Sequence, residues 1–301
     1  MERPSSPEPG SHRRWPFRRS GRPRPLRTVA LLPTLITLGN GVCGVVAILQ
    51  IGMGLAKGGE AANGNFYRAA WLILAAMVFD ALDGFVARLT KTASSFGAQL
   101  DSLCDLITFG VAPAFLVFAV TQDIRGFWER PIQVGCVLYA MCALIRLARF
   151  TVETAPDESS HREFAGLPSP AAAGVLAAAV LPAKQLYKVA PEVAQVVIPA
   201  VSSALPGLAL ACAILMVSRV KYPHLINRLL RGRRPFVTLV ELALVVALVV
   251  IFREFAFVIG FFAYAVIGPT LWLKKRFFRK AAAAPALTPV PPPPPRDTKI
   301  F

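Results

Sequence analysis

The sequence predicts an all-α fold: a polytopic integral membrane helical bundle of about eight transmembrane helices, within a range of six to eight. Hydrophobic residues make up 55% of the 301 residues, and the mean hydropathy is +0.54. Charged residues make up 17%, whereas a soluble domain carries about 25%. The apolar residues also gather in stretches of about 20, the length that a helix needs to cross a bilayer. Lipid is therefore the predicted solvent for most of the chain.

Eight apolar stretches are the candidate helices, and polar or basic segments separate them. Pro182 and Lys184 weaken the fifth stretch, because proline removes a helical hydrogen bond and a charge is costly in lipid. Arg253 and Glu254 divide the last two stretches, as in a tight hairpin at the membrane edge. The stretches lie near residues 28–56, 66–88, 97–120, 131–150, 169–187, 193–217, 236–252 and 254–273.

The predicted membrane domain covers residues 28–275, between two polar tails. Residues 1–27 are rich in Pro, Ser, Gly and Arg, which cannot bury a core, so we expect a disordered basic tail. Residues 276–301 are first basic and then proline-rich, which predicts a second disordered tail. The first apolar stretch is too long for the h-region of a cleaved signal peptide, so none is predicted.

The net charge of +16 is concentrated in segments that border the apolar stretches. With eight spans, both tails and the loops 146–168 and 219–235 fall on one side of the membrane, as does the connection 89–96. The positive-inside rule identifies that side as the cytoplasm. The basic clusters accompany no nucleic-acid-binding motif, so we expect contact with anionic lipid and none with nucleic acid.

The cysteines and histidines do not indicate a site. The five cysteines are scattered and form no CxxC pair, and the three histidines lie in polar segments without ligand spacing. These observations argue against a His/Cys metal centre and a Cys/His nucleophile, and favour cysteines as small packing residues.

Four aspartates lie near the end of the second apolar stretch and the start of the third, where a carboxylate in or beside the bilayer costs several kcal/mol. Their spacings of three and four residues place them on one face of each of two helices. Two helices joined by a short connection pack antiparallel, so the two acidic faces can meet. The first face carries Asp80, Asp83, Gly84 and Ala87, and the second carries Gly97, Asp101 and Asp105.

Four carboxylates together suit hard divalent cations such as Mg²⁺, Mn²⁺ or Ca²⁺. Two such ions would balance the four negative charges, and a pair of metal ions suits displacement at phosphorus. Arg88 can pair with a phosphate oxygen, and the small residues Gly84 and Ala87 let a ligand approach the helix. The alternatives are that the aspartates cap helices or line a solvated loop, or that they line the pore of a cation transporter or channel.

The complete pattern resembles the signature of the CDP-alcohol phosphatidyltransferases. It reads Asp80-x2-Asp83-Gly84-x2-Ala87-Arg88-x8-Gly97-x3-Asp101-x3-Asp105. The resemblance implies an enzyme that transfers a phosphatidyl group from a CDP-linked lipid to a hydroxyl and releases CMP. It also implies a homodimer.

The same resemblance implies roles for individual residues. Two divalent cations, Mg²⁺ or Mn²⁺, would be held by four aspartates, of which Asp105 would also act as general base on the acceptor hydroxyl. Thr37 and Asn40, at i and i+3 in the first span, would lie near the nucleotide, with helix–helix hydrogen bonding as the alternative. The implied metal ligands are Asp80, Asp83, Asp101 and Asp105, and the implied nucleotide or phosphate contacts are Gly84, Ala87, Arg88, Thr37 and Asn40.

Four segments resemble the bacterial phosphatidylserine synthases within this family: residues 33–40, 101–115, 146–150 and 164–172. They imply CDP-diacylglycerol and L-serine as substrates and the bacterial inner membrane as the location. Glycerol 3-phosphate, inositol phosphate and choline are the alternative acceptors. Thr34 departs from the family pattern, which usually has Asn at this position.

Two arginines could recognise the acceptor or the lipid phosphate. Arg146 and Arg149 are three residues apart at the predicted cytoplasmic end of the fourth span, where they could bind a carboxylate or a phosphate. The alternative is that they anchor the helix at the membrane edge. For Ser169, at the start of the fifth span, we expect helix N-capping.

Overall fold

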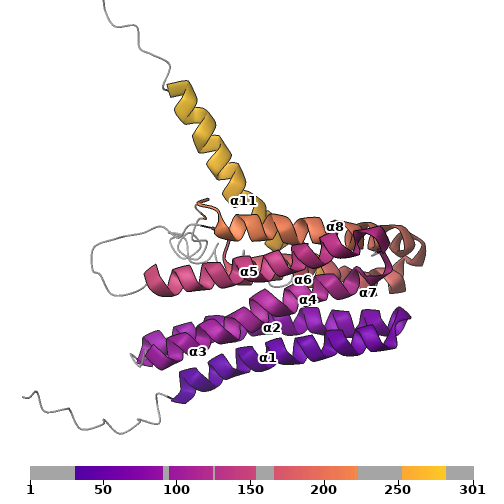
Figure 1. The fold of residues 1–301 in the computed structure, drawn as a ribbon, viewed down its shortest axis with the longest axis horizontal. Helices are drawn as coiled ribbons and strands as arrows, with labels where there is room; N and C mark the ends of the chain where they lie inside the picture. The colour runs from indigo at the N-terminus through magenta and orange to yellow at the C-terminus, as the bar shows by residue number, and fades with distance from the viewer. Residues whose placement is uncertain are drawn as a thin grey trace, which may run out of the picture.

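The computed structural model describes residues 31–90, 95–124, 126–153, 166–220, 222 and 253–282, and every regular element among them is helical (Figure 1). The predicted tail 1–27, the predicted span 236–252 and the last 19 residues of the predicted C-terminal tail, 283–301, lie outside these residues. The all-α class predicted from the sequence is confirmed.

The first two spans form an antiparallel hairpin of α1 (Leu31–Lys57) and α2 (Gly59–Thr90) (Figure 1). Gly58 and Gly59 make the turn with φ angles of 65° and 53°, a left-handed conformation that favours glycine. Helix α2 begins seven residues before the predicted start at residue 66, and its added first turns include the buried Ala62.

The third span is not one regular helix. It consists of α3 (Ser95–Asp105), the π-helix η2 (Leu106–Val111) and α4 (Ala112–Val120). In an α-helix the carbonyl of Phe109 would accept a hydrogen bond from residue 113, but Pro113 has no N–H. The hydroxyl of Tyr139 donates to this carbonyl instead, at 3.0 Å. The π-helix begins directly after Asp105. One of its backbone carbonyls, that of Phe109, is satisfied by a donor from α5 (Glu129–Glu153).

The fourth span is α5 (Glu129–Glu153), which follows two short 3₁₀ turns, η3 (Gln122–Ile124) and η4 (Gly126–Trp128). The fifth predicted span is broken into α6 (Ser169–Val180) and α7 (Pro182–Val189), because Pro182 ends the run of helical hydrogen bonds. Helix α6 is lined by small residues, nearly all of them buried, and packs against α2, α4, α8 and α11.

The remaining described helices are α8 (Pro191–Val217) and α11 (Arg253–Ala282). Helix α11 continues past residue 275, where the sequence predicts the end of the domain. Six helical segments among the described residues are long and apolar enough to cross a membrane. They are Pro33–Lys57, Ala62–Val86, Phe96–Val120, Glu129–Thr151, Pro191–Val217 and Arg253–Lys274. The chain is thus a polytopic helical membrane protein.

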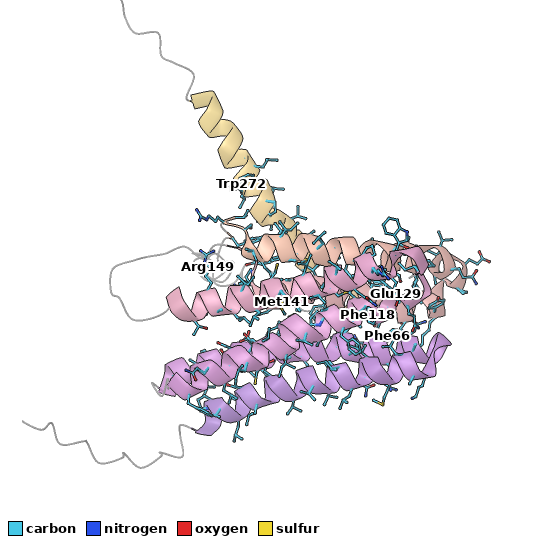
Figure 2. The ribbon with its side chains drawn as sticks, viewed as in Figure 1. Phe66, Phe118, Glu129, Met141, Arg149 and Trp272 are labelled. Carbon is cyan, nitrogen blue, oxygen red and sulfur yellow. The ribbon has the colours of Figure 1, made fainter. Side chains whose placement is uncertain are left out.

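The bundle has two distinct ends. Helix α5 runs from Glu129 at one end to Arg149 at the other, with Met141 between them (Figure 2). The Arg149 end also contains the end of α2 and the start of α3, and we call it the aspartate end (Figure 1). The α1–α2 turn and the start of α5 lie at the opposite end, which we call the far end.

Candidate functional site

The carboxylates of Asp80, Asp101 and Asp105 lie together at the aspartate end. One oxygen from each lies within 4.8 Å of the oxygens of the other two. Asp80 comes from α2, and the other two come from α3, so the two predicted acidic faces do meet. Three carboxylates at this separation could hold a metal ion.

The fourth aspartate, Asp83, is buried beside this group. Its carboxylate lies close to Asp101 and Thr37, and its side chain is 6% exposed. One oxygen of Asp83, Oδ2, and one of Asp101, Oδ1, are buried without a hydrogen-bond partner. Because a buried charged oxygen without a partner is costly, these two atoms fit the ligand set of a bound cation.

Helix α1 supports the cluster through Asn40. The Asn40 side-chain Nδ2 donates to Asp105 Oδ1 at 2.8 Å, and the Asn40 backbone carbonyl accepts from Thr108 Oγ1 at 3.2 Å. Asn40 is fully buried, so both bonds are shielded from solvent. The sequence left open whether Asn40 bonds another helix or lies near a nucleotide. The structure shows the helix–helix bond, made to the cluster itself.

The approach of α1 to the third span requires glycine. A Cβ atom at Gly41 would lie 2.8 Å from Cys104 Sγ, and one at Gly44 would collide with Thr108. These two positions are one helical turn apart on α1 and face the segment that carries Asp105. The small residues bring the backbones close enough for the Asn40–Asp105 hydrogen bond to form.

The other residues assigned to the nucleotide lie on α1 and α2. Thr37 is buried and donates to the Pro33 carbonyl at 3.0 Å. Gly84 has open space, since a Cβ atom there would meet nothing within 4 Å. Ala87 and Arg88 follow one turn later in α2.

The two predicted acceptor arginines have different environments. Arg146 is half-buried, and its Nη1 donates to Ser169 Oγ at 3.0 Å. Its Nε is buried without a hydrogen-bond partner. Arg149 is exposed. The expected N-capping role of Ser169 is wrong: Pro168 is the N-cap of α6, and no side chain caps it, because the Ser169 hydroxyl bonds Arg146 instead.

Thr108 and Tyr139 support the site and were not predicted. Thr108 lies three residues after Asp105, a spacing that places the two on one face of a helix and is visible in the sequence. Tyr139 lies in another apolar stretch, and nothing in the local sequence links it to Phe109. Pro113 was the available signal, since it leaves one carbonyl of the third span without its helical donor.

The sequence profile of the CDP-alcohol phosphatidyltransferase family matches residues 30–215. The chain belongs to this family. The matched range includes all four aspartates, Asn40 and Arg146, and it ends within α8. Membership makes the chain a phosphatidyltransferase enzyme, and it confirms the family predicted from the aspartate pattern.

Several relatives in this family are similar over most of the membrane domain. The CDP-diacylglycerol–serine O-phosphatidyltransferase of Helicobacter pylori is 31% identical over 200 residues, 66% of this chain and 75% of its own length. The enzyme of the same name from Methanocaldococcus jannaschii is 31% identical over 204 residues, 68% of this chain and 79% of its own. The archaetidylserine synthase of Methanothermobacter thermautotrophicus is 33% identical over 195 residues, 64% and 70% of the two chains.

Proposed function

We propose that the protein is a phosphatidylserine synthase. It transfers the phosphatidyl group of CDP-diacylglycerol to the hydroxyl of L-serine and releases CMP, a step of phospholipid synthesis. The observation that carries the proposal is the meeting of Asp80, Asp101 and Asp105 in a phosphatidyltransferase whose relatives are named for serine or archaetidylserine synthesis.

Two divalent cations, Mg²⁺ or Mn²⁺, are the proposed cofactors. Asp80, Asp101 and Asp105 would hold one, and the partnerless oxygens of Asp83 and Asp101 support a second beside it. When bound, such ions stabilise the attacking and leaving oxygens at the reacting phosphorus.

Asp105 is the proposed general base. Asn40 donates to Oδ1 of Asp105, which orients the carboxylate, and the carboxylate would accept the proton of the serine hydroxyl. As that proton moves to Asp105, the serine oxygen bonds to the phosphorus of the phosphatidyl group. The bond from this phosphorus to CMP breaks, and CMP leaves with the electron pair.

The nucleotide and its phosphates are proposed to lie along α2. The open space at Gly84 supports this placement, because no protein atom fills it. Ala87 adds little bulk one turn later, and Arg88 supplies a positive charge for a phosphate oxygen. Thr37 and Asn40 would border the nucleotide from α1.

Arg146 is the proposed contact for the serine carboxylate or the lipid phosphate. Ser169 holds one guanidinium nitrogen, while the buried Nε still lacks a partner and can donate to an anionic group. Arg149 would act at the surface, where an exposed guanidinium meets lipid phosphates more readily than a buried substrate.

The orientation and organisation are also proposals. The aspartate end borders the gaps 91–94 and 154–165, which belong to two of the basic connections, so we infer that it faces the cytoplasm. We infer further that the enzyme lies in a bacterial inner membrane, that residues 28–275 form one catalytic domain between the tails 1–27 and 276–301, and that it acts as a homodimer.

Purified protein supplied with CDP-diacylglycerol and Mn²⁺ or Mg²⁺ tests the function. The acceptors to compare are L-serine, glycerol 3-phosphate, inositol phosphate and choline, and the readouts are CMP release and the lipid product. Of the four acceptors, we expect only L-serine to give a lipid product, phosphatidylserine, together with CMP. CMP release with a different alcohol would identify that alcohol as the acceptor, and no release with any of the four would contradict the proposed reaction.

A further inference from the structure

A cavity of about 570 Å³ lies at the far end of the bundle, away from the aspartates. Helices α2, α4, α6, α7, α8 and α11 all contribute to its walls. Its lining is mainly apolar, with Phe66, Leu186, Val197 and Phe262 among the side chains. The volume lies within the usual range for ligand sites, about 300–1,000 Å³.

The cavity is separate from the proposed active site. Phe66 and Asp80 are 14 residues apart on α2, which corresponds to about 21 Å along the helix axis. Phe66 lies toward the end of the bundle that carries Glu129, whereas Arg149 marks the aspartate end (Figure 2). The two sites thus lie in opposite halves of a hydrocarbon layer that is about 30 Å thick.

The apolar lining favours a hydrocarbon occupant. An apolar cavity does not hold water well, because a buried water needs two to four polar partners. Among the described lining residues, the polar side chains that could serve are few, such as Asn63, Gln122 and Ser202. Since these helices stand in lipid, the available hydrocarbon is an acyl chain.

Two cations lie beside the cavity. Lys184 Nζ is 4.7 Å from the centre of the Tyr67 ring, and Arg253 Cζ is 4.9 Å from the centre of the Trp71 ring. Lys184 follows the lining residue Ala183 directly, and Arg253 lies two residues before Phe255, which also lines the cavity.

An acidic group partly offsets these charges. Glu254 Oε1 accepts a hydrogen bond from the Tyr67 hydroxyl at 2.9 Å. The same oxygen lies 3.4 Å from Arg253 Nη2. Glu254 therefore pairs with Arg253, and the Lys184 charge is left to attract an anion. Lys184 is also exposed, so a headgroup at the membrane surface can reach it.

We propose that this cavity binds an acyl chain of an anionic membrane phospholipid from the leaflet opposite the active site. The phosphate of that lipid lies near Lys184, and its chain lies among the apolar residues of α2, α7, α8 and α11. The lipid stabilises the far end, where α6 breaks into α7 and the helices leave space between them.

Photocrosslinking tests the proposal. The full-length protein is reconstituted in nanodiscs with phosphatidylglycerol or phosphatidylcholine that carries a photoreactive acyl chain, and labelled peptides are identified by mass spectrometry. We expect phosphatidylglycerol to label the peptides around Leu186 and Val197. Equal labelling by phosphatidylcholine would overturn the assignment to an anionic lipid.

Adjacent valines on α8 provide a matched pair of variants. Val197 lines the cavity, whereas Val196 is 73% exposed and does not. We expect Val197→Trp to reduce labelling about tenfold, which corresponds to about 1.4 kcal/mol of binding, and Val196→Trp to leave it unchanged. Equal labelling in both variants, or labels spread evenly over the lipid-facing helices, would overturn the proposal.

A charge variant keeps the test valid if Val197→Trp does not fold. Lys184→Gln should reduce phosphatidylglycerol labelling several-fold, whereas Lys188→Gln on the same helix should not. CMP release by each variant reports whether the enzyme is folded. A Lys184→Gln enzyme that is active and labelled as strongly as the wild type would contradict the placement of the phosphate.

Discussion

The side-chain amide of Asn40 donates a hydrogen bond to one carboxylate oxygen of Asp105, 2.8 Å away across the contact between α1 and α3. This bond joins the first span to the last acid of the cluster, and both residues are buried. It fixes the direction of the carboxylate that we propose as the base.

Replacing Asn40 with alanine should reduce turnover about ten- to 100-fold, because a hydrogen bond to a charged group contributes about 1.5–3 kcal/mol. The measurement is the rate of CMP release at saturating serine, together with thermal unfolding of the purified protein. Gln50→Ala is the control, since it removes a side-chain amide from the same helix far from the aspartates. Equal turnover of the Asn40→Ala and Gln50→Ala enzymes would contradict the orienting role.

The contact of α1 with the π-helix should not tolerate a single methyl group. A Cβ atom at Gly44 would collide with Thr108, so Gly44→Ala should separate the helices and reduce both stability and turnover. Gly52→Ala on the same helix should be neutral or stabilising by up to about 1 kcal/mol, because its Cβ meets nothing and alanine favours a helix. Melting temperature and CMP release in detergent distinguish the two variants, and similar behaviour would contradict the close approach.

The Tyr139 hydroxyl should stabilise the π-helix by supplying the donor that Pro113 lacks. Tyr139→Phe should cost about 1–3 kcal/mol of folding free energy, because it leaves the buried Phe109 carbonyl without this donor. In a Pro113→Ala background, where residue 113 has an N–H, the same change should cost less. A double-mutant cycle of unfolding free energies measures the difference, and additive costs would show that the two donors are not alternatives.

The helices and the acidic faces followed from the sequence because both depend on regular spacing. The lengths of the apolar stretches predicted the bounds of α1, α5 and α8 to within a few residues. The spacings of three and four residues predicted that Asp80 would meet Asp101 and Asp105. Interruptions were harder to predict, since η2 depends on a hydroxyl from a distant helix.

The partners of polar side chains were also difficult to predict. Asn40 binds Asp105, 65 residues away in the sequence, and Ser169 accepts from Arg146 instead of capping its own helix. Local sequence favoured capping because serine is a common N-cap residue, but the tertiary contact with α5 determined the outcome.

The two arginines should differ in their effect on serine. Arg146→Lys should raise the KM for serine or CDP-diacylglycerol about tenfold or more, because lysine cannot both bond Ser169 and present a second donor in the same plane. Arg149→Lys should change either constant less than about twofold, because the proposed role of this exposed side chain requires only a positive charge, which lysine retains. Equal effects of the two changes would show that Arg146 has no special role.

Divalent cations should be required, and the aspartates should set the requirement. EDTA should abolish CMP release, and added Mn²⁺ or Mg²⁺ should restore it. Asp101→Asn should raise the metal concentration for half-maximal activity at least about tenfold, because one charge and one ligand oxygen are lost. Glu192→Gln on the exposed start of α8 should leave that concentration unchanged. Full activity in EDTA would contradict the proposed metal site.

The most direct test of the account measures CMP and phosphatidylserine together for the wild type and for Asp105→Asn, with and without L-serine. The account predicts one phosphatidylserine for each CMP in the wild type, release that depends on serine, and a folded Asp105→Asn protein with at least about 100-fold less of both products. Serine-independent CMP release, or substantial turnover by Asp105→Asn, would contradict it.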